Sequence, residues 1–450
     1  MAVQVILIAH NQLDLVKLEI KVLGMFAGIE KQNIVVVDNA SEDGLREWLE
    51  EEQYPSYLIC DEGIENYSVI LNTAIREFHL TEDILILSPE YIVLEDTIAE
   101  LEHVLRSNEQ VGAVTGRMIW KGTEVGKDFS TALESARNQP KGEVPNAQRL
   151  SLGEDVLLIK KEAREEVGLF DERLILPYNT VLDYLFRAVC KGYQLYECAD
   201  AFFYYLGAVQ NEYLDKFGVD ADRSAMKEKW DMNYFNDYPN MELVQMMNAA
   251  ADAKINVLEI GCDCGVNLLE VKRRYPYANI YGVEINKKAA EIASHIAKVE
   301  VGNIEDKKIG FEDVKFDYIM FGDVLEHLRD PAGTIRYCRE LLKEDGRIFA
   351  CIPNVMHYSV MRQLVDGNFT YTDMGLLDRT HIHFFTYKEI VKMFQSEGYE
   401  IEQMGSIRTR ENDEKEENVA LIKALLALSS ETEEYMYYAY QYLVIVRVKR

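Results

Sequence analysis

The feature that most constrains the fold of this chain is an alternation of short β-branched segments with longer amphipathic segments, which occurs twice along its 450 residues. The apolar runs of the first series are 3–9, 33–39, 56–62 and 83–89, and those of the second are 255–261, 279–286, 316–322 and 345–354. Strand, helix and strand in series are typical of a parallel sheet with helices on both faces. The sequence therefore predicts a two-domain α/β protein, with domains at 1–206 and 251–450 and a helical, aromatic connector at 207–250.

The composition disfavours several kinds of partner. The chain carries 77 Asp and Glu residues against 48 Lys and Arg, and its net charge of −29 repels nucleic acids and anionic membranes. Its seven cysteines are scattered and odd in number, unlike a disulfide framework. No uncharged apolar run approaches the ~20 residues that span a bilayer, and the first residues do not resemble a signal peptide. We therefore expect a reduced, cytoplasmic protein without a transmembrane segment or a nucleic-acid partner.

The segment VLEIGCDCG, residues 257–265, ends the first strand of the second series in a turn with a glycine on each side. Gly261 and Gly265 allow a sharp turn and a close approach of a ligand to the backbone. Glu284 ends the next strand about 20 residues further on, where a carboxylate can accept hydrogen bonds from both hydroxyls of a ribose. Turn and carboxylate together predict a site for an adenosine-containing cofactor. A zinc site at the two cysteines of the turn is not expected, because no second Cys/His pair with suitable spacing follows.

These segments, together with the stretch DVLEHLRDP at 323–331, resemble the class I S-adenosylmethionine-dependent methyltransferases. The resemblance covers roughly 250–405 and the last strand, and the DVLEHLRDP stretch is its most specific match. It implies a Rossmann-like, seven-stranded methyltransferase fold with S-adenosylmethionine as cofactor. The cofactor-binding residues that it implies are Glu259, Gly261, Asp263, Gly265, Glu284, Ile285, Asn303, Ile304 and Asp323.

Asp263 is a departure from the family pattern, which has a glycine at this position of the first motif. Aspartate tolerates the positive φ that such a turn needs, so we expect the turn to survive. Its carboxylate would also face the cationic sulfonium and amino groups of the cofactor, where negative charge is favourable. Its Cβ atom would crowd the methionine moiety.

Candidate catalytic residues lie after the fourth strand of the second series and in the segment LLDRTHIHFFT. Methyl transfer is an in-line displacement, so the protein mainly aligns the acceptor and excludes water, but a hydroxyl acceptor also needs a base. His327, beside Asp323 and Glu326, is one candidate, and His381 is another, because the resemblance places its segment over the active site with Asp378. The alternatives are a hydrogen-bonded structural role for each histidine and turn or helix-capping roles for Asp323 and Glu326.

The first half carries a second set of motifs, beginning with the strand and polar turn VVVDNASEDG at 35–44. With ILIAHNQ, LSPEYIVLED and the long segment from 167 to 205, it resembles the inverting GT-A family 2 glycosyltransferases. The resemblance implies a nucleotide-sugar site with Asp38 beside the base, Glu90 in the motif that binds magnesium or manganese, and Asp183 in the motif of the catalytic base.

Several of these catalytic positions are altered. Glu90 is all that remains of the acid motif, Val181 occupies the first position of the base pair, and Tyr205 stands where a histidine is expected. Valine cannot deprotonate a hydroxyl, and tyrosine is a poor metal ligand at neutral pH. We therefore expect a non-catalytic domain without a metal, while Asp183 acting alone and a retained nucleotide-sugar or glycan site stay open.

Three hypotheses of function follow. The first is a methyltransferase that acts on a sugar or glycan-linked acceptor, with an N-terminal domain that positions the acceptor or another glycan-assembly enzyme; the sugar is inferred only from the fusion. The second is a bifunctional glycosyltransferase and methyltransferase of surface polysaccharide or glycoprotein biosynthesis. The third is a non-enzymatic scaffold in which both sites have decayed.

Overall fold

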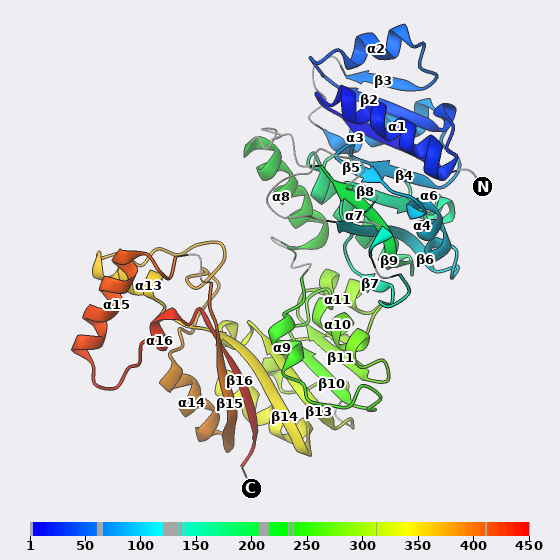
Figure 1. Ribbon diagram of the computed structural model, residues 1–450. Coiled ribbons are helices and arrows are strands. Elements are labelled where there is room, and N and C mark those ends of the chain that lie inside the picture. The colour runs from blue at the N-terminus through cyan, green and yellow to red at the C-terminus, as the bar shows by residue number, and fades with distance from the viewer. Residues whose placement is uncertain are drawn as a thin grey trace. The chain divides into compact units, whose positions relative to one another are not determined.

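The computed structural model describes residues 3–60, 66–119, 134, 137–139, 141–206, 216–232, 235, 238–311, 313–409 and 412–449. The chain divides into two compact units, Met1–Asp237 and Tyr238–Arg450, and the division lies within the segment predicted as a connector. Residues 207–215 of that segment lie outside the described residues. Both units consist of a sheet with helices (Figure 1). Within the described ranges, no helix combines the length and apolar character needed to cross a bilayer.

Nine strands form the sheet of the first unit, in the order β3-β2-β1-β4-β8-β6-β9-β5 with β7 on β9. The strands are β1 (Gln4–Ala9), β2 (Ile34–Asn39), β3 (Tyr57–Cys60), β4 (Ile84–Leu87), β5 (Tyr91–Val93), β6 (Val111–Ile119), β7 (Ala147–Arg149), β8 (Val156–Ile159) and β9 (Gln194–Tyr205). The first four in this order are parallel, and β8 runs antiparallel to β4 and β6. The β-branched runs of β1 and β2 are buried almost throughout, as expected for a sheet covered on both faces.

The helices of the first unit pack in two groups. Helices α1 (Leu13–Ala27), α2 (Leu45–Glu51) and α4 (Thr97–Leu105) share one apolar cluster with the sheet. Helices α3 (Tyr67–Glu77) and α6 (Lys161–Val167) contact α7 (Pro177–Cys190), which also contacts α8 (Lys216–Trp230). The first unit is therefore an α/β unit with a mixed sheet, and the GT-A assignment of its fold stays a prediction.

Seven strands form the sheet of the second unit, in the order β12-β11-β10-β13-β14-β16-β15. They are β10 (Asn256–Ile260), β11 (Asn279–Glu284), β12 (Lys298–Val301), β13 (Phe316–Gly322), β14 (Leu342–Pro353), β15 (Tyr399–Ile407) and β16 (Gln441–Val448). Only β16 runs antiparallel to its neighbours β14 and β15. The chain leaves β10 toward β11 and returns on its other side at β13, so the order reverses beside the carboxyl end of β10, where open α/β sheets bind ligands.

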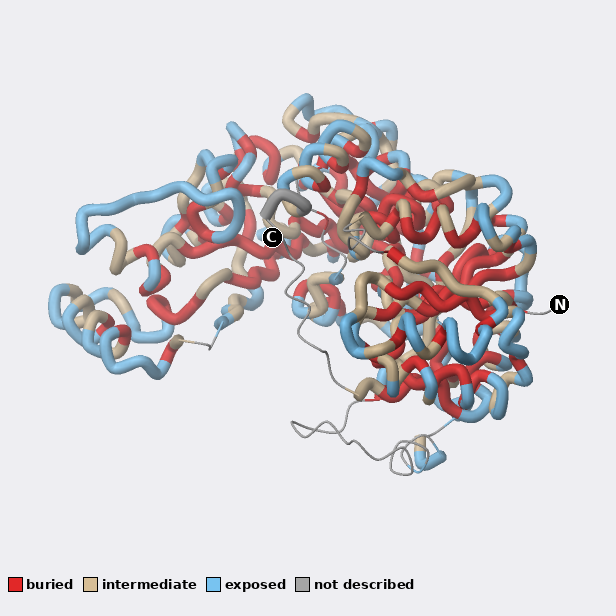
Figure 2. Tube along the Cα trace, turned by 90° about the horizontal axis from the view of Figure 1, so that it is seen from above, coloured by how far each residue is buried: buried red, intermediate tan, exposed pale blue. Residues whose placement is uncertain are grey.

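Two apolar clusters cover the two faces of this sheet. One holds α9 (Met241–Gln245), α10 (Val266–Arg274) and α11 (Lys287–Ala293), and the other holds α12 (Pro331–Leu341) and α14 (Tyr387–Ser396). Val257 and Leu258, adjacent on β10, belong to opposite clusters, as the alternation of side chains along a strand requires. Figure 2 shows buried residues gathered in the interior and exposed residues on the outer turns of the trace. The second unit has the Rossmann-like methyltransferase fold that the sequence predicts.

Beyond β14, three further helices form a smaller cluster of their own. They are α13 (Tyr358–Val365), α15 (Glu416–Leu428) and α16 (Tyr435–Tyr438).

Candidate active site

The turn after β10 has the backbone that its glycines predict. Gly261, Asp263 and Gly265 all have positive φ, at 67°, 47° and 90°. A Cβ atom at Gly261 would lie 2.6 Å from Cγ2 of Val324, on the loop after β13, so a side chain here would clash as well as be strained. Only glycine therefore fits at 261, and the turn, called the cradle below, has the tight left-handed backbone that the sequence predicts.

Glu284, at the end of β11, is tied to this turn. Its Oε2 accepts a hydrogen bond from the Asp263 amide at 2.9 Å, and its Oε1 accepts one from the Asn286 amide at 2.7 Å. Each oxygen of a carboxylate has a second acceptor direction, so both can still receive a ribose hydroxyl. The two amides fix the orientation of the carboxylate that the sequence predicts as the ribose ligand.

Glu259 lies beneath the turn in a buried position. Its Oε1 accepts a hydrogen bond from Asn267 Nδ2 at 2.7 Å, and Asn267 Oδ1 accepts one from the Asn240 amide at 2.7 Å. Its Oε2 is buried without a partner among the described residues, and burial raises the pKa of this carboxyl to about 8. Sequence reasoning missed both asparagines, because neither belongs to a motif and one lies in the predicted connector. A cationic amino group would satisfy the unpartnered oxygen.

Asp263 is partly buried at the rim of the cradle. Burial raises the pKa of its carboxyl to about 6, and the charge of Glu284 raises it further. The neighbouring Cys262 and Cys264 are buried, and neither belongs to a metal-ligating group among the described residues.

Of the residues predicted to contact the adenine, one is exposed and the others are buried or cap a turn. Ile285, just after β11, is 68% exposed, and Val301, at the end of the neighbouring β12, is 49% exposed. Ile304 is only 4% exposed and packs in the core, and the side chain of Asn303 caps a short helical turn by accepting from the Glu305 amide at 3.0 Å. The exposed apolar surface is thus offered by Ile285 and Val301, and the latter was not predicted.

Asp323 follows β13 with a φ of 55°. Its amide donates to the Cys351 carbonyl at 3.3 Å, and its Oδ1 accepts from Nε2 of Gln441. Burial raises the pKa of its carboxyl to about 6. Gln441 is a contact that sequence reasoning missed, since it depends on the antiparallel position of β16.

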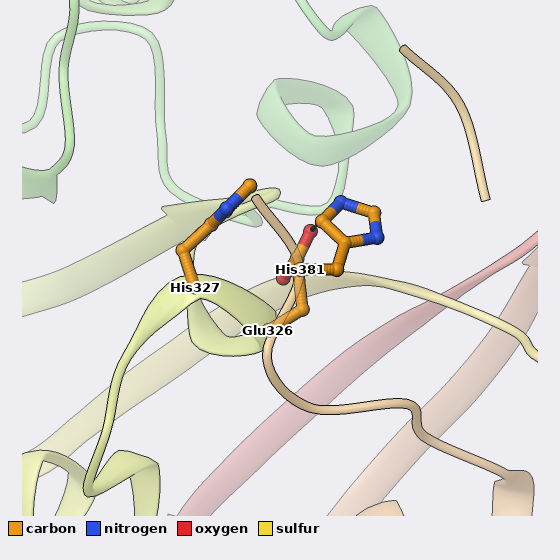
Figure 3. Close-up of side chains that lie close together, drawn as sticks. All are labelled: Glu326, His327 and His381. Atoms are coloured by element: carbon orange, nitrogen blue, oxygen red, sulfur yellow. Dashed lines mark ion pairs between the residues drawn. The ribbon is translucent and has the colours of Figure 1, made fainter. Parts of the chain in front are cut away.

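Glu326, His327 and His381, predicted as separate candidates, come together after the end of β13 (Figure 3). Their ligand atoms all lie within 4.8 Å of one another, and the two imidazole rings are 4.7 Å apart in an edge-on arrangement. Glu326 and His381 are buried, whereas His327 is exposed. Burial lowers the pKa of His381, and the neighbouring His327 lowers it further. Asp378 accepts hydrogen bonds from the amide and hydroxyl of Thr380 and does not belong to this group.

The first unit has a cavity of about 180 Å³ at the ends of its first strands. The residues that line it are Ile8, Ala9, His10, Gln12, Asn39, Tyr67, Ile70, Ser88, Glu90, Glu154, Asp155, Ile175, Leu176 and Pro177. Burial raises the pKa of Glu90, whose Oε1 accepts from Nε2 of Gln12. Asp38 is buried and its Oδ1 accepts from the Ser41 amide at 2.9 Å. Glu90 therefore lines the cavity together with two other acidic residues, Glu154 and Asp155. Asp38 is not among the residues that line it.

Asp183 lies elsewhere in the first unit, fully buried between α7 and α8. It accepts hydrogen bonds from Arg187 Nε and Trp230 Nε1, both at 2.9 Å, and pairs with Lys229 Nζ at 2.6 Å. Its carboxylate is therefore engaged in holding α8 on α7 and does not line the cavity.

Comparison with known proteins bears on the second unit. Residues 232–404 match the family model described as a methyltransferase domain. The chain is 31% identical over 120 residues to a ubiquinone biosynthesis O-methyltransferase of Neisseria meningitidis, covering 25% of this chain and 50% of that protein. It is 30% identical over 155 residues to the protein of that name from Dechloromonas aromatica, covering 32% and 63%. The chain thus spans about half to two thirds of the length of these relatives.

Solved structures that match part of the chain include the YcgJ protein of Bacillus subtilis, at 20% identity and a TM-score of 0.34, covering 47% of this chain and 99% of that one. A second is a SAM-dependent methyltransferase from Archaeoglobus fulgidus, at 18% identity and a TM-score of 0.31, covering 43% and 86%.

Proposed function

We propose that the second unit, which holds nearly all of the segment 232–404 that matches a methyltransferase domain, transfers a methyl group from S-adenosylmethionine to a hydroxyl oxygen of an acceptor. The observation that carries the proposal is Glu284, held by two backbone amides at the mouth of the glycine turn. S-adenosylmethionine, when bound, supplies an electrophilic methyl group on a sulfonium sulfur. Oxygen is proposed as the acceptor atom because the relatives carry the name O-methyltransferase.

The residues of the second unit supply the remaining functions. Glu284 would receive the ribose hydroxyls, Ile285 would cover one face of the adenine, and the unpartnered Oε2 of Glu259 would receive the amino group. Glu326 and His381 stand near the end of β13 to receive the proton of the acceptor hydroxyl. A carboxylate partner beside an imidazole is a common arrangement for a base.

Calorimetric titration of S-adenosylmethionine and of its demethylated product tests the cofactor site. We expect the wild type to bind both and Glu284→Ala to bind at least about 10-fold more weakly, a loss of about 1.4 kcal/mol. Glu291→Ala is the matched control, because Glu291 is an exposed glutamate on the adjacent α11. Absence of binding to the wild type would refute the proposal and leave the scaffold hypothesis.

A sugar or glycan-linked acceptor is the narrower form of the proposal. Its support is the cavity of the first unit, whose lining combines three acidic residues with apolar side chains and has no Lys or Arg. Such a lining suits a neutral polyhydroxylated ligand better than a diphosphate without a bound cation, because the acidic residues would repel the negative charge of the diphosphate. Methyl transfer from labelled cofactor to a panel of free sugars, nucleotide sugars and catechols separates the acceptor classes. Release of nucleoside diphosphate from a sugar donor would instead support the bifunctional alternative.

A further inference from the structure

The Glu326 carboxylate is buried in an unusual state. Its side chain is 1% exposed, and neither of its oxygens has a hydrogen-bond partner among the described residues. Asp323 and Asp378 lie near enough to act on its charge, so the surroundings are negative rather than compensating. A buried carboxylate without hydrogen bonds is costly unless a cation or a metal satisfies it.

Both histidines bring a ring nitrogen within 4.8 Å of this carboxylate. The Nδ1 atom of His381 lies 3.2 Å from the Leu376 carbonyl oxygen, and the Nδ1 atom of His327 lies 3.2 Å from the Thr380 carbonyl oxygen. A carbonyl accepts only, so Nδ1 of His381 donates its proton. The Thr380 hydroxyl also lies 3.2 Å from Nδ1 of His327 but gives its own proton to Asp378, so this Nδ1 donates too, and the lone pair of each ring is left on Nε2. Histidines that bind metals typically donate their other ring nitrogen to a carbonyl or a carboxylate in this way.

The backbone holds these groups in place. The carbonyl oxygen of Glu326 accepts from the amides of Ile382 and His383, both at 3.0 Å, which joins the segment around His381 to the end of β13. The distance from His381 Nε2 to Glu326 Oε1 is 3.9 Å. Ligands of a tetrahedral zinc ion, at about 2.0–2.2 Å from the metal, lie about 3.3–3.5 Å from one another. The ligand atoms lie within 4.8 Å of one another, so the group would contract by at most about 1.4 Å to close around an ion.

We propose that Glu326, His327 and His381 bind one divalent transition-metal ion, with zinc as the ion that this donor set suits best. Two imidazoles and one carboxylate are a donor set of catalytic zinc sites, which keep a further position open. The exposure of His327 leaves that position accessible from solvent.

The role of the ion rests on the proposed function. With the ion bound, Glu326 and His381 serve as ligands and no longer take the proton themselves. In the open position the ion would bind the acceptor hydroxyl and lower the pKa of that group, so that the proton leaves to solvent. The oxygen then forms the bond to the methyl carbon, while the carbon–sulfur bond breaks and its electron pair stays on sulfur.

Metal binding by the full chain tests the site directly. Chelator-treated protein is titrated with zinc against a chromophoric competitor, and with cobalt(II), whose visible spectrum reports the donor atoms. We expect one equivalent to bind without a thiolate-to-metal charge-transfer band. Affinity should fall at least 10-fold in His381→Ala and in Glu326→Gln and stay unchanged in His383→Gln, since His383 lies in the same segment but outside the group. The variants of the buried residues Glu326 and His381 could lose metal binding because they fold poorly. His327→Ala changes an exposed ligand, so a loss of affinity in this variant cannot be attributed to a folding defect.

The proposal is overturned if the wild type binds less than one equivalent, or if His327→Ala and His381→Ala bind zinc as tightly as the wild type. Titration of S-adenosylmethionine into the metal-free protein separates the two proposals. Metal binding without cofactor binding refutes the methyltransferase function alone, and cofactor binding without metal binding refutes the metal site alone.

Discussion

Asp263 offers a direct test of the electrostatics of the cofactor turn. Its pKa is about 6 in the folded protein against 3.8 ordinarily, chiefly because burial disfavours its charge. Between these pH values the folded state holds a proton that the unfolded state has lost, so stability falls as pH rises from about 4 to above 6. The shift of about 2 units corresponds to about 3 kcal/mol at pH 7. Asp263→Asn removes the charge while keeping a residue that tolerates positive φ. We therefore expect the variant to be more stable than the wild type at pH 7 by up to about 3 kcal/mol.

The assay must report on the second unit alone. The three tryptophans of the chain, at 48, 120 and 230, all belong to the first unit, so tryptophan fluorescence would miss the change. Hydrogen exchange followed by mass spectrometry, on peptides from β10 and α10 in urea, reports unfolding of the second unit locally. Glu259 titrates in both proteins, but its pKa falls once the Asp263 charge that helps to raise it is gone, which adds to the expected gain.

Two results would contradict this reasoning. One is an Asp263→Asn protein that is no more stable than the wild type at pH 7. The other is a gain that persists at pH 3.5, where the aspartate is already largely neutral and the two proteins should converge. In the cofactor titration, the same variant should bind S-adenosylmethionine about 10-fold more weakly, because the charge that costs stability would face the cationic sulfonium and amino groups.

Three further outcomes follow from the contacts. Glu284→Gln, which keeps one acceptor oxygen, should bind the cofactor more tightly than Glu284→Ala in calorimetry; equal affinities would contradict the role of the ribose contacts. Gly261→Ala should destabilise the second unit by about 2 kcal/mol, through its positive φ and its 2.6 Å approach to Val324, and Val324→Ala should restore part of this in hydrogen exchange. Asp183→Asn should destabilise the first unit by about 3 kcal/mol, monitored through Trp230 fluorescence, and leave methyl transfer intact; unchanged stability would contradict the buried ion pairs.

The cofactor side of the site is local in sequence and could be predicted largely from it. The turn at 257–265 needs glycines because its φ angles are positive, and Glu284 ends the strand that pairs directly with β10. Both features depend on neighbouring strands joined by one helix, which periodicity and turn residues specify. Ile304 shows the limit of a motif match, because its position matches while its side chain faces the core.

The acceptor side could be predicted only as separate candidates. His327 and His381 were each identified, but the approach of His381 to Glu326 joins segments 55 residues apart. The contact between Gln441 and Asp323 spans 118 residues and depends on the last strand entering between β14 and β15. Residue types at these positions indicate polar chemistry without indicating which groups meet.

The sequence by itself determined the two α/β units, the glycine turn and the carboxylate at the end of β11, because these follow from local conformational preference and strand pattern. Only the tertiary structure decided that Asp183 is engaged with α8, that Glu259 keeps an unpartnered oxygen, and that Glu326 meets two histidines. Those outcomes depend on which distant segments pack together and on which hydrogen-bond partners this packing brings to each buried polar atom. Hydrophobic periodicity specifies the face that a side chain occupies but not its partner across the core.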